Sequence, residues 1–350
     1  MVRPVDIAGR MIGPGQRCFI IAEAGVNHNG EVALAKRLIE AAADAGADAV
    51  KFQTFRADRL VSRSAPKAAY QRGTTDPEES QFEMIRRLEL SPGAHRDLQG
   101  ACRRCGVLFL STPFDEDSVA LLEELGVPAF KISSGDVTNW PLLSYVARRG
   151  RPVILSTGMS DLEEVADAVR TIRGAGNGRL ILMHCVSQYP ADPAEANLRA
   201  MQTLAGSFAV PVGFSDHTRG TEVALAAVAL GACVVEKHLT LDRRLAGPDH
   251  RASSDPGEFR TLVRGIRAVE AALGDGRKRP MPGERDTALA ARRSLIAAQD
   301  IPAGTPLTDA LIAIQRPGGG LPPSARARLL GRKVKVDLRG GTVLTWDVLV

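Results

Sequence analysis

Two histidines each follow a short apolar run in the second half of the sequence. His217 lies in GFSDHT after VPVGF (210–214), and His238 lies in EKHLTLD within the run that starts with CVVE (233–236). Since successive strands of a parallel barrel deliver their end residues to one mouth, two such imidazoles can share a divalent metal. Two histidine ligands leave positions open for water and a substrate oxygen, which indicates a Lewis-acid site rather than a structural one.

Two lysines and several hydroxyl residues stand at corresponding places in other apolar runs. Lys51 lies in AVKFQTF and Lys131 lies in AFKISSGD, at the ends of the second and fourth predicted strands. Hydroxyl groups share this rim, and nearby glycines allow close backbone approach: Thr112, Ser134, Ser156 and Ser215, with Gly135 and Gly158. Lysines, hydroxyls and loop amides together bind phosphate or carboxylate. A metal beside a dianion pocket predicts a phosphorylated substrate that reacts with a polarised carbonyl.

Eight segments with the same pattern of apolar and polar residues explain how these side chains can lie close together. Each opens with an apolar run and breaks into polar residues: FIIAEAGVNHNG (19–30), AVKFQTF (49–55), VLFLSTPFD (107–115), AFKISSGD (129–136), VILSTGMS (153–160), LILMHCVSQYP (180–190), VPVGFSDHT (210–218) and VVEKHLTLD (234–242). Stretches with apolar spacing near 3.6, such as LEEVADAVRTIRGAG, predict helices between them. The pattern predicts an α/β fold, a (β/α)8 TIM barrel. A doubly wound sheet is less favoured, because its function gathers at one switch point.

The domain organisation follows from where this alternation stops. The barrel domain is predicted over residues 1–274, with residues 1–17 as an N-terminal hairpin that closes the barrel's bottom. Residues 275–292 are charged and rich in Gly and Pro, which predicts a linker. Residues 293–350 contain short runs such as SLIAAQD and LIAIQR between Gly/Pro turns, which predicts a small β-rich domain. Because so short a domain buries little core, we expect it to pack as a cap over a barrel mouth, its own or a partner's.

Composition narrows the function classes. Hydrophobic content of 44% and charged content of 24% are ordinary for a globular protein. No apolar run approaches the ~20 residues of a membrane span, and the N-terminus lacks a signal-peptide core, so no membrane association and a cytoplasmic location are predicted. The net charge is +5, but the basic residues lack interleaved aromatics, which argues against nucleic-acid binding. Five scattered cysteines, including the single CxxC of Cys102 and Cys105, argue against a disulfide framework or a zinc site.

Taken in order, the motifs of this chain resemble those of a known family. They are IAEAGVNHNG, AGADAVKFQTF, EESQFEMIRRLELS, STPFD, KISSGD, STGMS, HCVSQYPADP, GFSDHT, EKHLTLD, GPDHRAS and, near the end, QRPGGG. The series is similar to that of the N-acetylneuraminate (sialic acid) synthases and their bacterial nonulosonate-synthase relatives. The resemblance implies a TIM barrel followed by an antifreeze-protein-like (β-clip) domain. It also implies condensation of phosphoenolpyruvate with an open-chain N-acetylated amino sugar, which gives a nine-carbon α-keto acid and phosphate.

The resemblance assigns roles to individual residues. The groups expected to hold phosphoenolpyruvate are Lys51, Thr112, Lys131, Ser134, Ser156 and Ser215. The expected catalytic residues are Glu23, Asp136 and Lys131, and the expected sugar-binding residues are Gln53, Ser187, Tyr189, Asp249 and Arg316. His217 and His238 are expected to bind a divalent metal, typically manganese, with magnesium or cobalt as alternatives.

The chain departs from the family pattern at two of these positions. Asp136 stands where sialic acid synthases carry Glu, and Ser187 stands where some members carry Asn. The acceptor therefore stays open between N-acetylmannosamine, its 6-phosphate, and the diacetamido-trideoxy hexoses that lead to legionaminic or pseudaminic acid. The segment 61–80 (VSRSAPKAAYQRGTTDPEES) is predicted to form a long loop at the mouth that selects the substrate.

Two other functions are weighed against this one. A 3-deoxy-ulosonate synthase that uses a sugar phosphate is disfavoured by the long match and the C-terminal domain. A non-catalytic sugar-binding protein is disfavoured because the lysines and histidines of the site are all present. The resemblance also implies a homodimer with swapped C-terminal domains, in which Arg316 reaches the partner's sugar site. An extended linker of 18 residues could span up to about 60 Å.

Overall fold

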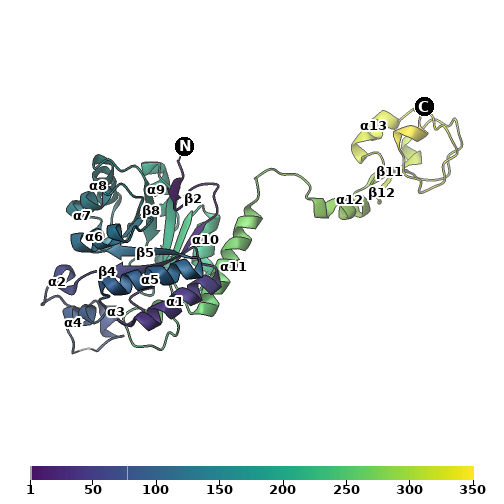
Figure 1. The fold of residues 1–350 in the computed structure, drawn as a ribbon. Helices are drawn as coiled ribbons and strands as arrows, with labels where there is room; N and C mark the ends of the chain where they lie inside the picture. The colour runs from purple at the N-terminus through teal and green to yellow at the C-terminus, as the bar shows by residue number, and fades with distance from the viewer. Residues whose placement is uncertain (1, 77) are drawn as a thin grey trace. The chain divides into compact units, whose positions relative to one another are not determined.

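The computed structural model describes residues 2–76 and 78–350. The chain divides into two compact units, Met1–Gly274 and Asp275–Val350, and each is described here by itself (Figure 1). Among the described residues no helix is long and apolar enough to cross a membrane. The five cysteines are free thiols.

The first unit is built around eight parallel strands. They are β3 (Phe19–Gly25), β4 (Ala49–Thr54), β5 (Leu108–Pro113), β6 (Phe130–Ile132), β7 (Val153–Ser156), β8 (Leu180–Cys185), β9 (Val212–Asp216) and β10 (Val234–His238). Their order in the sheet is β5-β4-β3-β10-β9-β8-β7-β6, and the end strands β5 and β6 lie side by side. The sheet therefore curves into a nearly closed barrel, which confirms the predicted TIM-barrel fold.

Each strand is followed by a helix that covers the outside of the barrel. The helices are α1 (Val32–Ala45), α5 (Pro92–Cys105), α6 (Glu116–Glu124), α7 (Trp140–Ala147), α8 (Leu162–Gly174), α9 (Ala200–Phe208), α10 (Glu222–Ala229) and α11 (Pro256–Leu273). Several begin at the capping residue that the sequence places there. The Asp161 side chain accepts from the Glu164 amide at the start of α8, and Asp255 caps α11 just before Pro256. Such caps satisfy amides that have no partner inside the helix.

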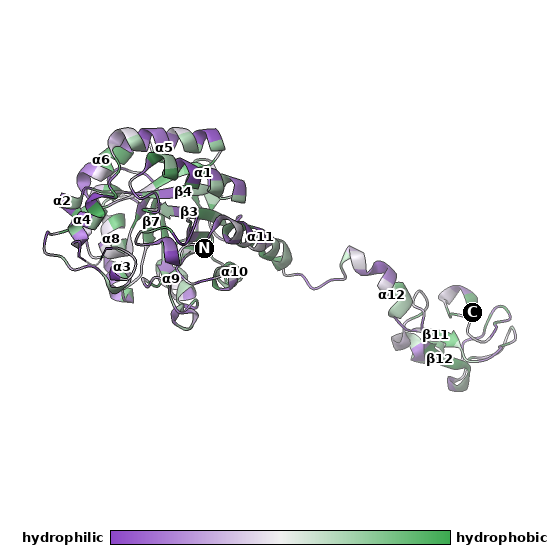
Figure 2. Cartoon of the chain, turned by 90° about the horizontal axis from the view of Figure 1, so that it is seen from below, coloured by the Kyte–Doolittle hydropathy of each residue, from purple (hydrophilic) through white to green (hydrophobic). Residues whose placement is uncertain are grey.

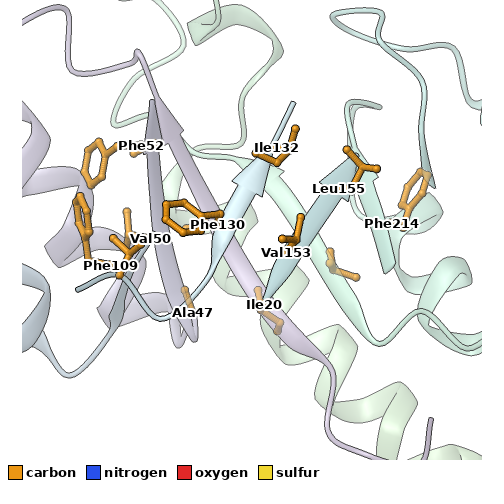
Figure 3. Close-up of a cluster of buried hydrophobic side chains, with 14 of the residues drawn as sticks. Ile20, Ala47, Val50, Phe52, Phe109, Phe130, Ile132, Val153, Leu155 and Phe214 are labelled. Atoms are coloured by element: carbon orange, nitrogen blue, oxygen red, sulfur yellow. The ribbon is translucent and has the colours of Figure 1, made fainter. Parts of the chain in front are cut away.

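The alternation of side chains along each strand separates two kinds of surroundings. One set points outward and packs against the helices, as Val50, Phe109, Phe130, Leu155 and Phe214 do in Figure 3. The other set points into the barrel, where the first inward residues of most strands are apolar and the last are polar. On β10 the inward positions are Val234, Glu236 and His238, in that order. The polar layer therefore lies at the carboxyl ends of the strands and the apolar layer beneath it.

A hairpin at the N-terminus packs against this apolar layer. Strands β1 (Val5–Ile7) and β2 (Arg10–Ile12) pair antiparallel, and the buried side chains of Val5, Ile7 and Ile12 join one cluster with the inward residues of the barrel. These inward residues include Ile21, Leu110, Ile154 and Ile181. The hairpin thus closes the amino-terminal end of the barrel interior.

Three short helices lie in the long connection between β4 and α5. They are α2 (Ala57–Leu60), α3 (Ala69–Arg72) and α4 (Gln81–Arg86). The segment 61–80, predicted as a loop, therefore contains one helical turn in its described part, and the side chains of this turn lie at the barrel mouth.

The second unit has a hydrophobic core of its own. Strands β11 (Ser294–Ala297) and β12 (Ile312–Gln315) form a small antiparallel sheet, and both are rich in hydrophobic residues (Figure 2). Isolated bridges extend this β structure, and the core includes Leu295, Leu307, Leu329 and Leu344. Part of the predicted linker forms α12 (Arg285–Ala291), so the fully extended reach of about 60 Å is an overestimate.

Removal of a large outward side chain should destabilise the barrel. Phe130 lies on β6, is 0% exposed and belongs to the core between the strands and the helices. The Phe130→Ala substitution should lower the free energy of unfolding by about 3–5 kcal/mol, because it leaves a cavity in a packed core. Urea unfolding followed by circular dichroism measures the change. The matched control is Leu162→Ala on the surface of α8, where Leu162 is 44% exposed and a change within about 0.5 kcal/mol is expected. Equal effects of the two substitutions would contradict this picture of the core.

Candidate active site

A cavity of about 390 Å³ opens at the carboxyl ends of the barrel strands. Thirteen of the fifteen residues predicted for the site line it: Glu23, Lys51, Gln53, Thr112, Lys131, Ser134, Ser156, Ser187, Tyr189, Ser215, His217, His238 and Asp249. They come from all eight strands or from the connections that follow them. The barrel thus brings together residues that lie more than 200 positions apart in the sequence.

The floor of this cavity holds two buried ammonium groups with two buried carboxylates. Lys51 Nζ lies 2.7 Å from Glu23 Oε2 and 3.2 Å from Thr112 Oγ1. Lys131 Nζ lies 3.4 Å from Glu236 Oε1, and the same oxygen lies 3.9 Å from Lys51 Nζ. All four charged side chains are at most 5% exposed. Each ion is therefore compensated by an opposite charge, as burial requires.

Hydroxyl groups surround the lysines. Lys131 donates to Ser156 Oγ at 2.6 Å, and Ser215 donates to Glu236 Oε1 at 3.2 Å. Ser134 Oγ accepts from the Gly158 amide at 2.9 Å. A Cβ at Gly158 would lie within 3.0 Å of Ser134 Oγ and 2.8 Å from Cys185 Sγ, so only glycine fits there. The lysines, hydroxyls and close backbone make a site suited to a phosphate or carboxylate group.

The two carboxylates have opposite pKa shifts. Burial raises the pKa of Glu236, but the ammonium groups of Lys131 and Lys51 outweigh it, and the net pKa falls to about 2. For Glu23, burial exceeds the lowering effect of Lys51, and the pKa rises to about 7. Burial also lowers the pKa of Lys131. Glu236 is therefore a fixed anion, whereas Glu23 can gain and lose a proton near neutral pH.

The two histidines lie next to each other at the mouth. Their ring centroids are 5.5 Å apart, and the Tyr189 ring lies 4.3 Å from that of His217 and 5.6 Å from that of His238. His217 Nδ1 lies 2.7 Å from the Val186 carbonyl, to which it donates, so Nε2 keeps its lone pair. His238 Nδ1 is buried, has no hydrogen-bond partner within the described part of the chain, and lies 3.9 Å from Asp249 Oδ2.

These features fit a divalent metal only in part. Burial lowers the pKa of both imidazoles, so both are neutral, as ligands must be. However, no group of three or more His, Cys, Asp or Glu side chains converges on a metal position in residues 2–76 and 78–350. The protein therefore offers two imidazole ligands, and oxygen atoms of water or substrate would have to complete the coordination.

Outward residues of the same strands hold the histidines in place. Lys237 Nζ lies 2.6 Å from Asp216 Oδ2, and both side chains are at most 2% exposed. Asp216 precedes His217 and Lys237 precedes His238, so this ion pair joins β9 to β10 directly beside the site. It lies on the helix side of the barrel wall and does not line the cavity.

The other end of the cavity is apolar. Val26, Phe55 and Leu88 form a buried cluster with the partly buried Leu60, Ile85 and Phe114, and all six residues line the cavity. They follow the ends of β3, β4 and β5 or belong to the connection before α5. The cavity thus combines a charged floor with an apolar side wall, which suits a ligand that has an anionic end and an apolar group.

Two predicted site residues do not line the cavity. Asp136 accepts hydrogen bonds from Ser133 Oγ at 2.9 Å and Asn139 Nδ2 at 3.1 Å, within the turn that follows β6. Its carboxylate is directed into that turn, so the structure does not support Asp136 as a catalytic base. Arg316 belongs to the second unit, where it is exposed after β12.

Two residues of the site, Glu236 and Tyr70, were not predicted from the sequence. Glu236 stands two positions before His238 in one strand, and the period of two puts both side chains on one face. This spacing could have revealed it. Tyr70 lines the cavity from α3, and its ring lies 5.2 Å from that of Tyr189. No local pattern marks Tyr70, because its place depends on how the segment 61–80 folds over the mouth.

The cavity combines an anion pocket with two neutral histidines at the carboxyl ends of the barrel strands, which is typical of the active site of an enzyme. The model described as the NeuB family matches residues 38–278, and the model described as the SAF domain matches residues 292–350. The chain therefore belongs to the NeuB family, as the motifs predicted.

Curated relatives extend over almost the whole chain. The chain is 46% identical to N,N'-diacetyllegionaminic acid synthase of Legionella pneumophila, over 96% of this chain and 95% of that protein. It is 47% identical to the protein of the same name from Campylobacter jejuni, over 91% of this chain and 96% of that protein. The chain is 38% identical to N-acetylneuraminate-9-phosphate synthase of Mus musculus, over 94% of this chain and 92% of that protein. It is 34% identical to pseudaminic acid synthase of Helicobacter pylori, over 94% of this chain and 96% of that protein. The chain is thus an enzyme of the nonulosonate synthase class.

A solved structure agrees with this classification. The crystal structure of N-acetylneuraminic acid (sialic acid) synthetase from Leptospira borgpetersenii in complex with citrate matches with a TM-score of 0.72 and 36% identity. The match covers 82% of this chain and 95% of that one.

The buried charge cluster gives a prediction on stability. Glu236→Gln should lower the free energy of unfolding by about 3–5 kcal/mol, because two buried ammonium groups lose their shared carboxylate. Thermal and urea unfolding without ligand measure the loss. The control is Glu124→Gln, which breaks the exposed pair with Arg96 and should cost less than about 1 kcal/mol. Wild-type stability of Glu236→Gln would mean that the lysines do not depend on this carboxylate.

Proposed function

We propose that this enzyme condenses phosphoenolpyruvate with an open-chain, N-acylated amino sugar to give a nonulosonic acid and phosphate. The observation that carries the proposal is the pair of buried lysines among hydroxyl groups, which line one cavity with two neutral histidines. An anionic substrate and a carbonyl acceptor could thus meet in one cavity.

The reaction sets clear demands on the site. C3 of phosphoenolpyruvate, an enol ester, attacks the aldehyde carbon of the sugar, and the aldehyde oxygen takes up a proton. Water adds at C2, where positive charge develops, and loses a proton to a base. The C2–O bond to phosphate then breaks and the C2 hydroxyl gives up its proton to the departing phosphate, which leaves a ketone at C2. The site must therefore hold an anion, stabilise a developing alkoxide and accept a proton.

The charged floor meets the first demand. Lys51 and Lys131, with Thr112, Ser134, Ser156 and Ser215, hold the phosphate and carboxylate of phosphoenolpyruvate. Before the substrate binds, Glu236 keeps both ammonium groups compensated, and the hydroxyls hold them in position. The anion pocket is therefore preformed, which lowers the reorganisation needed in the transition state.

Glu23 is the proposed base. It lines the cavity, and its raised pKa of about 7 matches a group that takes a proton from water near neutral pH. Asp136 lacks this position, because its carboxylate is bonded inside its own turn.

His217 and His238 are the proposed ligands of a divalent metal, most often manganese. When bound, such an ion would supply Lewis-acid polarisation of the acceptor's aldehyde. The protein's own part is to present two neutral imidazoles, with His217 oriented by its bond to Val186 and both rings covered by Tyr189.

The proposed acceptor is a diacetamido-trideoxy hexose that leads to a legionaminic-type acid. Identity is higher to relatives named for diacetyllegionaminic acid than to those named for N-acetylneuraminate-9-phosphate or pseudaminic acid. The apolar wall around Val26, Phe55 and Phe114 suits a sugar that carries a methyl group and a second acetamido group in place of hydroxyls. N-acetylmannosamine is the second candidate, since Gln53 and Asp249 offer polar partners to its hydroxyls.

Arg316 is proposed to act from a partner subunit. It follows β12 in a glycine-rich turn, is exposed, and has a guanidinium suited to sugar hydroxyls and carboxylates. We propose a homodimer in which the second unit of each chain serves the barrel of the other.

Phosphate release with a panel of acceptors tests the proposed function. The panel contains the diacetamido-trideoxy hexoses that lead to legionaminic and pseudaminic acid, N-acetylmannosamine and its 6-phosphate. The legionaminic precursor should have a kcat/KM about 10-fold or more above that of N-acetylmannosamine, because two apolar contacts are gained. Metal-depleted enzyme should be inactive until a divalent ion is restored. No phosphate release with any acceptor would refute the proposed function, and a preference for N-acetylmannosamine would refute only the acceptor.

A pair of isosteric variants separates the two candidate bases. Glu23→Gln should lower kcat by about 100-fold or more, the usual contribution of a general base, whereas Asp136→Asn should retain kcat within about threefold. Steady-state kinetics with saturating substrates measures both, and circular dichroism checks the fold. The reverse order of effects would restore Asp136 as the base.

Complementation tests the swapped dimer. Arg316→Ala and Lys131→Met chains should each be inactive alone. When they are mixed and reassembled, up to about a quarter of wild-type activity should return, because half of the dimers are mixed and each has one intact site. No recovery from verified heterodimers would mean that Arg316 acts on its own barrel or takes no part.

A further inference from the structure

The segment 61–80 at the barrel mouth is organised around one buried lysine. The Lys67 side chain is only 3% exposed, and its Nζ donates to Thr75 Oγ1 at 3.0 Å and to the Asp76 carbonyl at 2.6 Å. It also lies 3.1 Å from Glu79 Oε1, so all three ammonium protons have acceptors. Lys67 thus ties together the two ends of a turn that carries α3.

The same turn is attached to the connection that follows β10. Thr74 Oγ1 donates to the Pro248 carbonyl at 3.3 Å, and Arg251 donates to the Gly73 carbonyl at 3.2 Å. Glu79 in turn pairs with Arg87 at 2.5 Å. Residues 67–76 therefore have a fixed position over the mouth instead of extending into solvent as a free loop.

The side chain that this arrangement presents to the cavity is Tyr70. Its ring lies 5.2 Å from the ring of Tyr189, at an interplanar angle of 32°. Both rings line the cavity, and Tyr189 is packed against both histidines. The two rings pack against each other, and the aromatic surface that they present to the cavity is suited to a flat, weakly polar group.

We propose that Tyr70 and Tyr189 form an aromatic subsite for an acylamino group of the acceptor sugar, and that Lys67 is the positioning residue that holds Tyr70 in it. The planar amide of an acylamino group packs on an aromatic face, and its methyl group fills space that water would otherwise occupy. A free hydroxyl in the same place would lose hydrogen bonds to water and gain little. This inference rests on the proposed function, because it names part of the acceptor of that reaction.

The buried carboxylate of Glu79 explains why a lysine is needed at position 67, although Lys67 does not line the cavity. Glu79 has a side chain that is 10% exposed, and its carboxylate is compensated by Lys67 and Arg87 together. Loss of the Lys67 ammonium would leave the Thr75 hydroxyl and the Asp76 carbonyl without this donor. The Glu79 carboxylate would keep only Arg87 as a positive partner. The turn would then open, and Tyr70 would lose its position opposite Tyr189.

A double-mutant cycle on acceptor binding tests the inference. Tyr70→Ala should raise the KM for the acceptor about 10-fold, and Tyr70→Phe should change it less than about threefold, because the ring and not the hydroxyl makes the contact. Lys67→Met should raise the same KM about five- to tenfold. The double variant should resemble Tyr70→Ala alone, since Lys67 acts through Tyr70. In all variants the Kd for phosphoenolpyruvate, measured by calorimetry, should stay within about twofold of wild type.

The matched control is Lys36→Met, which removes an exposed lysine paired with Asp97 on the barrel surface and should leave both constants unchanged. Additive effects of Lys67→Met and Tyr70→Ala, or equal losses of acceptor and phosphoenolpyruvate affinity, would show a merely structural role and overturn the inference. An active wild type with an unchanged acceptor KM in Tyr70→Ala would also overturn it while the proposed function stands. An inactive wild type with every acceptor would instead overturn the proposed function, and this inference with it.

Discussion

Balancing two ammonium groups inside a closed barrel is the constraint on which the rest of the site depends. Lys51 and Lys131 can remain charged there only because Glu23 and Glu236 lie beside them and serine and threonine hydroxyls take up the remaining donors. The alternation of the strands makes this arrangement possible, since it sends these groups inward at one level and keeps the apolar residues below them. The anion pocket is therefore part of the folded barrel itself and does not need a ligand to assemble it.

The wall and the mouth of the barrel contribute in different ways. In the wall, buried polar pairs such as Asp216–Lys237 join neighbouring strands on their outer side, and they leave the inward neighbours little freedom. At the mouth, the position of the side chains depends on a connection without regular strands, which is held by the Lys67 ammonium and by hydrogen bonds to the connection after β10. In the proposed arrangement, the reacting groups thus lie on the strands of the barrel, and the contacts that select the acceptor lie on the connection at its mouth.

The sequence predicted the barrel and most of the cavity because both follow from local periodicity. Polar residues at the ends of apolar runs identified Lys51, Lys131 and both histidines without any knowledge of the structure. Asp136 does not line the cavity, because its carboxylate is hydrogen-bonded to Ser133 and Asn139 in its own turn, a detail that no strand pattern encodes. Tyr70 was beyond reach, since its place results from contacts among residues of an irregular segment. The role proposed for Arg316 depends on subunit assembly, which no local pattern encodes.

The N-terminal hairpin has a consequence for the order of events in turnover. Because Val5, Ile7 and Ile12 fill the amino-terminal end of the barrel interior, the cavity has a solid floor and both substrates must share one entrance. In the proposed arrangement, a sugar held near the histidines and tyrosines would lie between the entrance and the lysines of the anion pocket. Phosphoenolpyruvate would then enter first, and phosphate would leave after the nine-carbon product. A cavity with only one entrance then predicts that phosphate inhibits competitively against phosphoenolpyruvate but not against the sugar.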